Sequence, residues 1–329
     1  MTLEEELAEM KAMIATLLSR TPADETSSEP FGSWLLRWYE LYKKPQNGVN
    51  TSHFMLYYIQ KRISPVLGEI PLNQLSGDRI QEYLNMIERK NTRQKIGMII
   101  RGSLDRAVRL RLIKYNPFDS VEIPTYKKKR YRPVFPEEQG KIVSYETNVL
   151  YRAVFAILVC TGLRIGEFLA LDESCVNLNT RSIGVYRSVD IRSGELQNRT
   201  KTYTSVRRIP FCAFLDGDLR FLLRYIKRNG GLTYNQVKLH FQRMFARLKM
   251  NGIVLHSLRH TFCCMAYRVG IPDKTIQKLM GHAVLDVTMN VYLDLLGSGV
   301  SPFDEYFKML KNDVEKRPAD FWVFSAPKN

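Results

Sequence analysis

The chain has 329 residues, of which 45% are hydrophobic and 25% are charged, so it is long enough to form about two globular domains with sizeable cores. Its 49 Lys and Arg residues against 33 Asp and Glu residues give a net charge of +16 and a pI near 9.6, which predicts a polyanionic partner, either nucleic acid or an anionic membrane surface. No uncharged apolar run approaches the roughly 20 residues that span a bilayer, and the N-terminus lacks the basic start and apolar core of a secretory signal, so the sequence argues against membrane attachment and export.

Five cysteines occur in mostly apolar surroundings, and none is spaced as CxxC. They are Cys160, Cys175, Cys212, Cys263 and Cys264. An odd count without metal-ligand spacing predicts reduced thiols, which indicates a cytoplasmic compartment.

Residues 1–20 contain a short apolar seam at heptad spacing, with gaps of 4, 3, 4 and 3 between its members. The members are Leu3, Leu7, Met10, Ile14 and Leu17. A helix of this length is marginal alone, so the segment either pairs with the same segment of another protomer or forms an isolated amphipathic helix. Residues 21–30, TPADETSSEP, contain almost no apolar side chain and are predicted to be a flexible linker.

Residues 31–124 show helical periodicity throughout, in segments covering 31–44, 52–63, 76–90 and 91–111. Four helices joined by short loops predict a compact helical bundle. Several basic side chains of this region are candidates for DNA contact: Lys43, Lys44, Arg93, Lys95 and Arg101. A charged helix face is either simply solvated or binds phosphates, and the sequence leaves both interpretations open.

Residues 125–133 are predicted to be a basic linker between two domains, because the run YKKKRYR lies between Pro124 and Pro133. Its candidate phosphate-binding side chains are Lys127, Lys128, Lys129, Arg130 and Arg132. Solvation alone would explain such a run, and a strand that contacts phosphates between two DNA-binding domains would explain it as well.

Residues 134–300 are predicted to form a second, α+β domain. An apolar helix near residues 149–160 ends at Gly162, and the next helix begins near Leu163. Arg164 and Glu167 are i and i+3 neighbours there; their ion pair either holds the guanidinium rigid for phosphate binding or is an ordinary surface pair. Residues 181–211 alternate in polarity, which predicts a small antiparallel sheet with turns near residues 193–194 and 202–205, and Lys201 lies at the second turn.

Residues 256–292, HSLRHTFCCMAYRVGIPDKTIQKLMGHAVLDVTMNVY, carry four candidate reactive side chains. An apolar stripe of Leu258, Phe262, Met265 and Val269 predicts an amphipathic helix, with His256 and Arg259 together on its first turn and away from the stripe. A second helix is predicted to end at Gly281, which places His282 in a tight turn, and Tyr292 follows ten residues later.

His256 and His260 are also spaced like a zinc pair, but Arg259 lies between them and the Glu of an HExxH motif is missing, so no metal is predicted. The sequence contains no GxxxxGK[ST] loop, and we expect no cofactor.

Beyond Tyr292, residues 302–314 are predicted to form an amphipathic helix, and Phe321 to Phe324 are apolar in succession. This much apolar surface after the predicted domain needs a partner. We expect residues 301–329 to form a C-terminal segment that docks either on a neighbouring protomer or back on its own.

These motifs together resemble the tyrosine recombinases of the phage integrase family. The resemblance rests on TGLRIGE at residues 161–167, TKTYTSVRRIP at 200–210, HSLRH at 256–260, the Gly-His turn at 281–282 and Tyr292, in the order of the family. It implies a mainly α fold with a small antiparallel β-sheet, made of a helical, SAM-like core-binding domain and an α+β catalytic domain.

The resemblance also implies a site-specific recombination that needs neither metal nor cofactor. Tyr292 is the expected nucleophile, giving a 3′-phosphotyrosyl link to DNA. Arg164, Arg259 and His282 are expected to bind the phosphate. His256 is the expected general base and Lys201 the general acid, with Glu167 as an orienting residue and His260 as a structural one.

The expected partners are double-stranded DNA with inverted-repeat core sites, further copies of the chain as a dimer to tetramer on DNA, and accessory DNA-bending or excision factors, in a bacterial cytoplasm. Two alternatives remain. A related type IB topoisomerase would use the same chemistry to relax supercoils, and a catalytically idle DNA-binding regulator would form no covalent adduct.

Overall fold

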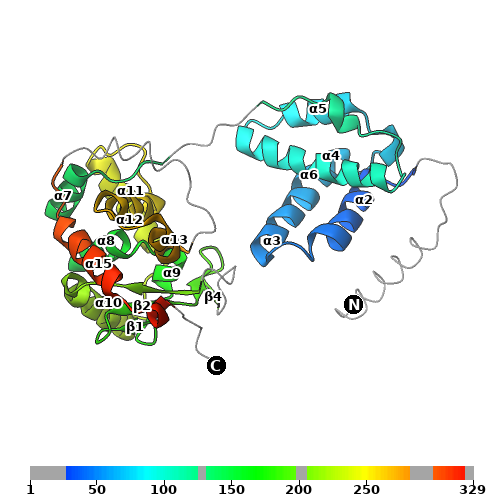
Figure 1. Ribbon diagram of the computed structural model, residues 1–329. Helices are drawn as coiled ribbons and strands as arrows, with labels where there is room; N and C mark the ends of the chain where they lie inside the picture. The colour runs from blue at the N-terminus through cyan, green and yellow to red at the C-terminus, as the bar shows by residue number, and fades with distance from the viewer. Residues whose placement is uncertain (1–26, 125–130, 198–205, 282–298, 323–329) are drawn as a thin grey trace. The chain divides into compact units, whose positions relative to one another are not determined.

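The computed structural model describes residues 27–124, 131–197, 206–281 and 299–322 (Figure 1). The chain divides into two compact units, Met1–Lys128 and Lys129–Asn329, and each has a hydrophobic core of its own. The division falls inside the predicted linker at residues 125–133. The predicted N-terminal helix at residues 1–20 lies outside the described residues.

The first unit is a helical bundle, and the four helical segments predicted there are confirmed. They are α2 (Phe31–Trp38) with the π-helical turn η1 (Tyr39–Lys43), α3 (Val49–Tyr58) continuing through η2 (Ile59–Ile63) into α4 (Ser64–Leu67), α5 (Gly77–Asn85) and α6 (Lys90–Arg109), with 3₁₀ turns η3 (Leu72–Gln74) and η4 (Pro117–Ser120). The fully buried Trp34 ties α2 to α6, because its indole Nε1 donates to the Ser103 carbonyl at 3.1 Å.

The second unit packs helices around the apolar helix α8, whose residues from Ala153 to Thr161 are all buried. Its helices are α7 (Pro136–Tyr145), α8 (Val149–Thr161), α9 (Ile165–Leu169), α10 (Asp216–Asn229), α11 (Tyr234–Arg247), α12 (Leu255–Arg268), α13 (Asp273–Met280) and α15 (Asp304–Lys316), with 3₁₀ turns η6 (Ala213–Leu215) and η7 (Ala319–Trp322). Helices α10 and α12 both pack against α8. A helix apolar on every side is stable only when it is covered in this way.

Short strands lie beside these helices, so the predicted mainly α fold with a small antiparallel sheet is confirmed. The strands are β1 (Val176–Asn177), β2 (Ser182–Val185), β3 (Ser188–Val189), β4 (Leu196–Gln197) and β5 (Arg207–Pro210). They form an antiparallel sheet in the order β1-β2-β5 and a separate β3-β4 hairpin. The predicted turn near residues 193–194 is confirmed, with Gly194 at φ +76°. In the sheet, Val185 pairs with Arg207 and Ile183 pairs with Ile209.

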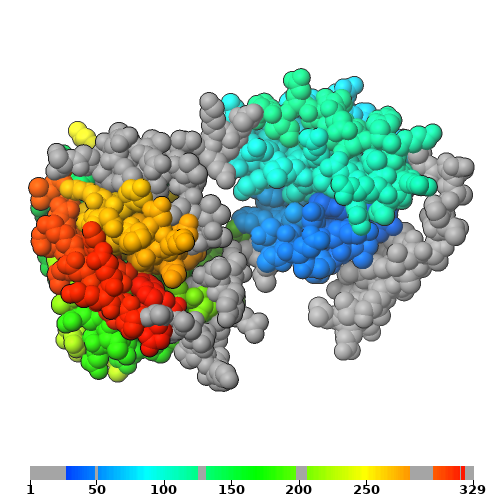
Figure 2. Space-filling model, viewed as in Figure 1, coloured from blue at the N-terminus to red at the C-terminus, as the bar shows by residue number. Residues whose placement is uncertain are grey.

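The apolar face of the C-terminal segment packs on the unit to which the segment belongs. Phe303, Tyr306, Phe307 and Leu310 are buried in the core of their own unit, where α15 contacts α12 and β5. Figure 2 shows the orange-red atoms of this segment against the amber atoms of the preceding helices. The apolar face of residues 304–322 therefore has a covering surface within its own unit, and docking on a neighbouring protomer stays a prediction. Residues 323–329 lie outside the described residues.

Among the described residues, no helix combines the length and the apolar character that crossing a bilayer requires.

Candidate active site

The turn between α8 and α9 places Arg164 at the start of a helix. Gly162 ends α8 with φ +63°, and a Cβ at this position would lie 2.6 Å from Cδ1 of the buried Phe262. Only glycine satisfies both constraints. The chain therefore turns sharply, and Arg164 becomes the residue that precedes α9 rather than one within it.

The predicted Arg164–Glu167 ion pair is confirmed, and it is not an ordinary surface pair. Arg164 Nη1 lies 2.7 Å from Glu167 Oε1, and the Arg164 backbone N–H donates to Glu167 Oε2 at 2.8 Å. The Glu167 side chain is only 3% exposed, whereas that of Arg164 is 35% exposed. One buried carboxylate thus holds the backbone and the head group of an arginine that still reaches solvent.

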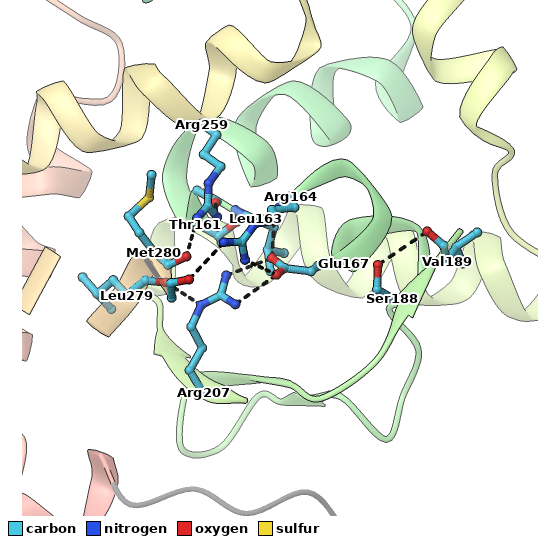
Figure 3. Close-up of polar contacts among 12 residues, drawn as sticks. Thr161, Leu163, Arg164, Glu167, Ser188, Val189, Arg207, Arg259, Leu279 and Met280 are labelled. Carbon is cyan, nitrogen blue, oxygen red and sulfur yellow. Dashed lines mark hydrogen bonds and ion pairs between the residues drawn. The ribbon is translucent and has the colours of Figure 1, made fainter. Parts of the chain in front are cut away.

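Arg207, on β5, also binds Glu167, and the sequence analysis missed it. Its Nη1 and Nη2 donate to the two carboxylate oxygens at 3.0 and 2.8 Å, and its side chain is 6% exposed (Figure 3). Two parallel N–H···O bonds of this kind fix the relative orientation of both groups. A sequence signal existed, because Arg207 has the same parity along the strand as the apolar Ile209 and Phe211, which places it on the buried face.

Three arginines converge on the C-terminal end of α13. Arg207 Nε donates to the Leu279 carbonyl at 2.6 Å, Arg259 Nη2 donates to the Met280 carbonyl, and Arg164 Nη2 donates to the Gly281 carbonyl at 3.0 Å. The last carbonyls of a helix have no partner within the helix and carry the negative end of its dipole. The three guanidinium groups donate hydrogen bonds to the carbonyls of residues 279–281, which directly precede His282 in the sequence.

Arg259 is more buried than its predicted position off the apolar stripe of α12 suggests. The residue is 2% exposed, and its Nη1 also donates to the Gly162 carbonyl. Its guanidinium therefore joins the ends of α8 and α13. Burial, followed by the charges of Arg164 and Arg207, lowers the pKa of Arg259 to about 9, so the side chain stays charged at pH 7.

Glu167 stays ionised at neutral pH although it is buried. Burial by itself raises the pKa of a carboxyl, but the guanidinium of Arg207, and then those of Arg164 and Arg259, outweigh it and lower the pKa of Glu167 to about 2. The described cluster thus holds three positive charges against one negative charge. The remaining positive charge favours an anion beside Arg164, its most exposed member.

His256 lies at the solvent side of this cluster on the first turn of α12. The residue as a whole is exposed, but the protein around the ring removes part of its hydration, which disfavours the charged form. The charges of His260, Arg259 and Arg164 disfavour it further, so the pKa of His256 is lowered to about 4. The rings of His256 and His260 meet edge to face with centroids 4.9 Å apart. His256 is therefore neutral at pH 7 and able to accept a proton.

A cavity of about 410 Å³ opens beside His256 and Arg259, with walls that include Leu163, Phe241 and Phe245. A larger hollow of about 840 Å³, lined by residues of β1, β2 and α10, contains none of the predicted catalytic residues. The described residues contain no group of three or more His, Cys, Asp or Glu side chains placed to hold a metal ion.

The other predicted catalytic residues, Lys201, His282 and Tyr292, lie outside the described residues, as do the predicted phosphate-binding residues Lys127 to Arg130. Their roles remain predictions.

Arg132, the last residue of the predicted basic linker, has protein partners. Its Nη1 and Nη2 each lie 2.6 Å from a carboxylate oxygen of Glu138, and its Nε donates to the Asn251 carbonyl at 3.0 Å. Its guanidinium also lies over the Phe135 ring, 4.8 Å from the centroid. This geometry anchors the start of α7, which explains the residue without DNA.

In the first unit, Lys44, Lys95 and Arg101 are exposed, whereas Lys43 and Arg93 are half-buried. Lys44 pairs with Glu40 at 2.6 Å and Arg101 pairs with Asp119 at 3.4 Å, so their binding of phosphate stays a prediction. Arg93 donates to the Ile87 carbonyl from Nε at 3.0 Å and from Nη2 at 2.7 Å, so it holds the chain that leaves α5.

Two family models match the chain. Residues 137–297 match the phage integrase family, and residues 30–87 match the N-terminal SAM-like domain of phage integrases. The chain belongs to the phage integrase family of tyrosine recombinases. This integrase is 25% identical over 265 residues to the ICEBs1 integrase of Bacillus subtilis strain 168, a match covering 72% of this chain and 71% of the relative.

Solved structures share the fold of this integrase. The Tn1549 transposon integrase in complex with a circular intermediate DNA matches with a TM-score of 0.67 and 18% identity, over 86% of this chain and 99% of the other. A lambda integrase dimer bound to a COC′ core site matches with a TM-score of 0.60 and 19% identity, over 91% of this chain and 89% of the other. Both matches support the fold described for this chain.

Proposed function

We propose that this integrase is a site-specific DNA recombinase of a prophage or other mobile element, which cleaves and rejoins DNA through a 3′-phosphotyrosyl link to Tyr292. The observation that carries the proposal is the convergence of Arg164, Arg259 and Arg207 on the end of α13, with one carboxylate to balance three positive charges. A phosphodiester in the reaction gains negative charge on its non-bridging oxygens, and a rigid cationic site stabilises that charge.

Arg164 is the best placed of the three for the phosphate. Glu167 fixes it from the protein side, and about a third of its side chain faces solvent. Arg259 is held by the carbonyls of Gly162 and Met280, which fix its guanidinium at the ends of α8 and α13, and we propose that it also binds the phosphate. His282, one residue beyond the Gly281 carbonyl that Arg164 binds, adds the expected third hydrogen bond.

The proton transfers follow from the chemistry of the step. The Tyr292 oxygen forms a bond to phosphorus while the bond from phosphorus to the 5′-oxygen breaks. His256, neutral at pH 7, accepts the tyrosine proton, and Lys201 donates a proton to the leaving 5′-oxygen. The link retains the energy of the phosphodiester, so the 5′-hydroxyl of another strand reverses the step and completes the exchange.

Strand exchange requires partners. We propose that the integrase binds double-stranded DNA with inverted-repeat core sites, assembles as a dimer to tetramer on that DNA, and works with accessory DNA-bending or excision factors. The net charge of +16 supports a DNA partner. The five cysteines are buried and free, which suits the reducing bacterial cytoplasm.

The test is formation of a covalent adduct with DNA trapped from the host element. We expect Tyr292→Phe to bind DNA as the wild type does but to form no phenol-resistant adduct, because only the nucleophilic oxygen is lost. The matched control is Tyr145→Phe, which removes the hydroxyl of an exposed tyrosine in the same unit and should form the adduct normally.

An adduct in Tyr292→Phe would refute the assignment of the nucleophile. Wild-type protein without any adduct would identify a DNA-binding regulator, and relaxation of a plasmid lacking a core site would identify a topoisomerase.

A further inference from the structure

Arg207 holds together three elements that each carry part of the proposed site. It lies on β5, the strand that follows the predicted hairpin containing Lys201. Its Nη atoms bind Glu167 on α9, and its Nε binds the Leu279 carbonyl at the end of α13. Arg164 also forms hydrogen bonds to both Glu167 and the end of α13.

The packing around Arg207 leaves it little freedom. A Cβ at Gly281, whose φ is +59°, would lie 3.1 Å from both Cδ and Nη1 of Arg207. The guanidinium is therefore in contact with the backbone immediately before His282. Movement of Arg207 would release Glu167 and the end of α13 together.

The chemistry at Glu167 shows why Arg164 depends on Arg207. The carboxylate oxygen Oε1 accepts from both Arg164 and Arg207, at 2.7 and 3.0 Å. A buried carboxylate needs this compensation, since a charge left unpaired in the interior is costly. Arg207 supplies the largest of the charge interactions that keep the pKa of Glu167 low.

We propose that Arg207 is a positioning residue for DNA cleavage, which holds the Glu167 carboxylate in place and thereby orients Arg164 and the end of α13 for the scissile phosphate. It does not touch the phosphate, because its head group is committed to Glu167 and Leu279 and is buried. The proposal rests on the proposed recombinase function, and it adds a residue whose effect on cleavage is separable from an effect on DNA binding.

The test compares single-turnover adduct formation by Arg207→Met, Arg207→Lys and Arg208→Met on DNA trapped by the wild type. Arg208 is the matched control. It is the next residue on β5, it lies on the other side of the strand over the Phe321 ring at 5.3 Å, and it lines the larger hollow away from the site.

We expect Arg207→Met to lower the rate of adduct formation by about 10- to 100-fold, the usual effect of removing a residue that orients a reactive group. Arg207→Lys keeps the charge but cannot bridge both carboxylate oxygens and the Leu279 carbonyl, so it should recover only part of the rate. Arg208→Met should stay within about twofold of the wild type, as should half-site DNA affinity in every variant.

Two further readouts separate positioning from a general loss of stability. Without Arg207 the pKa of Glu167 should rise, so the variant should lose activity on acidification at a higher pH than the wild type does. The effects of Arg207→Met and Glu167→Gln should also be strongly non-additive, because the two residues act as one unit. Where Arg207→Met does not fold, Arg207→Lys carries the same measurements.

Equal rates in Arg207→Met and Arg208→Met would overturn the inference. So would additive losses of rate in Arg207→Met and Glu167→Gln, together with no change in the pH at which Arg207→Met loses activity on acidification. Either result, obtained while the wild type forms the adduct, leaves the proposed function intact. Absence of an adduct with wild-type protein would overturn the proposed function and the inference together.

Discussion

The cis packing of α15 predicts that Phe307 is essential to the stability of the second unit. The Phe307 side chain is 0% exposed, and its ring centroid lies 5.8 Å from that of Phe262 and 5.3 Å from that of Tyr306. Phe262 is the ring against which Gly162 packs, at the turn that leads to Arg164. Phe307→Ala would therefore leave a cavity beneath that turn.

The expected loss is about 3–5 kcal/mol in the free energy of unfolding, because the surrounding rings are held on several sides and cannot close the cavity. With a urea dependence of about 2 kcal/mol per molar, the unfolding midpoint should fall by about 2 M. Met309→Ala is the matched control: Met309 lies on the same helix but is 44% exposed, so the change should cost about 0.5 kcal/mol or less.

Hydrogen exchange resolved by peptide, measured across a urea series, is the suitable assay because the two units can unfold separately. Peptides from α8 and α12 should exchange at lower urea concentration in Phe307→Ala than in the wild type. Peptides from α6, in the first unit, serve as an internal control within the same molecule. Equal effects of Phe307→Ala and Met309→Ala would refute the reasoning, and a midpoint that rises with protein concentration would show that α15 is donated between protomers.

The remaining predictions concern charge and proton transfer. The pKa of Glu167 is lowered from 4.5 to about 2, which corresponds to about 3 kcal/mol of stability at about 1.4 kcal/mol per pKa unit. This stability is present above about pH 4.5 and is lost as the pH falls towards 2, so the urea midpoint of Glu167→Gln should change less over this pH range than that of the wild type. Equal changes of the midpoint with pH in the two proteins would contradict the assignment. Lys201→Ala should cleave an ordinary phosphodiester slowly but recover when sulfur replaces the leaving 5′-oxygen, since a thiolate leaves without a proton; equal slowing of both substrates would show that Lys201 only binds. Replacing Lys127, Lys128 and Lys129 with Ala should reduce the slope of log affinity against log salt by up to about three units, at roughly 0.9 per phosphate contact, and an unchanged slope would mean that the run is only solvated.

The sequence by itself predicted the elements whose cause is local. The helices of the first unit follow from apolar periodicity, and the ends of α8 and α13 follow from Gly162 and Gly281, whose positive φ few other residues adopt. The Arg164–Glu167 pair follows from a spacing of three residues. The order of the motifs indicated the family for the same reason, because spacing along the chain needs no knowledge of the fold.

The partners of a side chain that are distant in sequence were decided only by the tertiary structure. Arg259 was predicted to project from α12 beside His256, but the ends of α8 and α13 pack against it and their carbonyls take its guanidinium. Arg207 and Arg208 are adjacent and chemically identical, so composition cannot separate them. The strand places them on opposite faces, and only the position of Glu167, 40 residues away, makes Arg207 part of the site.

The C-terminal segment shows the same division. Its amphipathic pattern correctly predicted a helix with an apolar face. The pattern does not say which surface covers that face, because burial against the same chain and burial against a neighbour place identical demands on the sequence. The surface that covers this face in the described chain is formed by α12 and β5. These elements come together only when the whole unit folds, so the pattern of residues 302–314 alone cannot identify them.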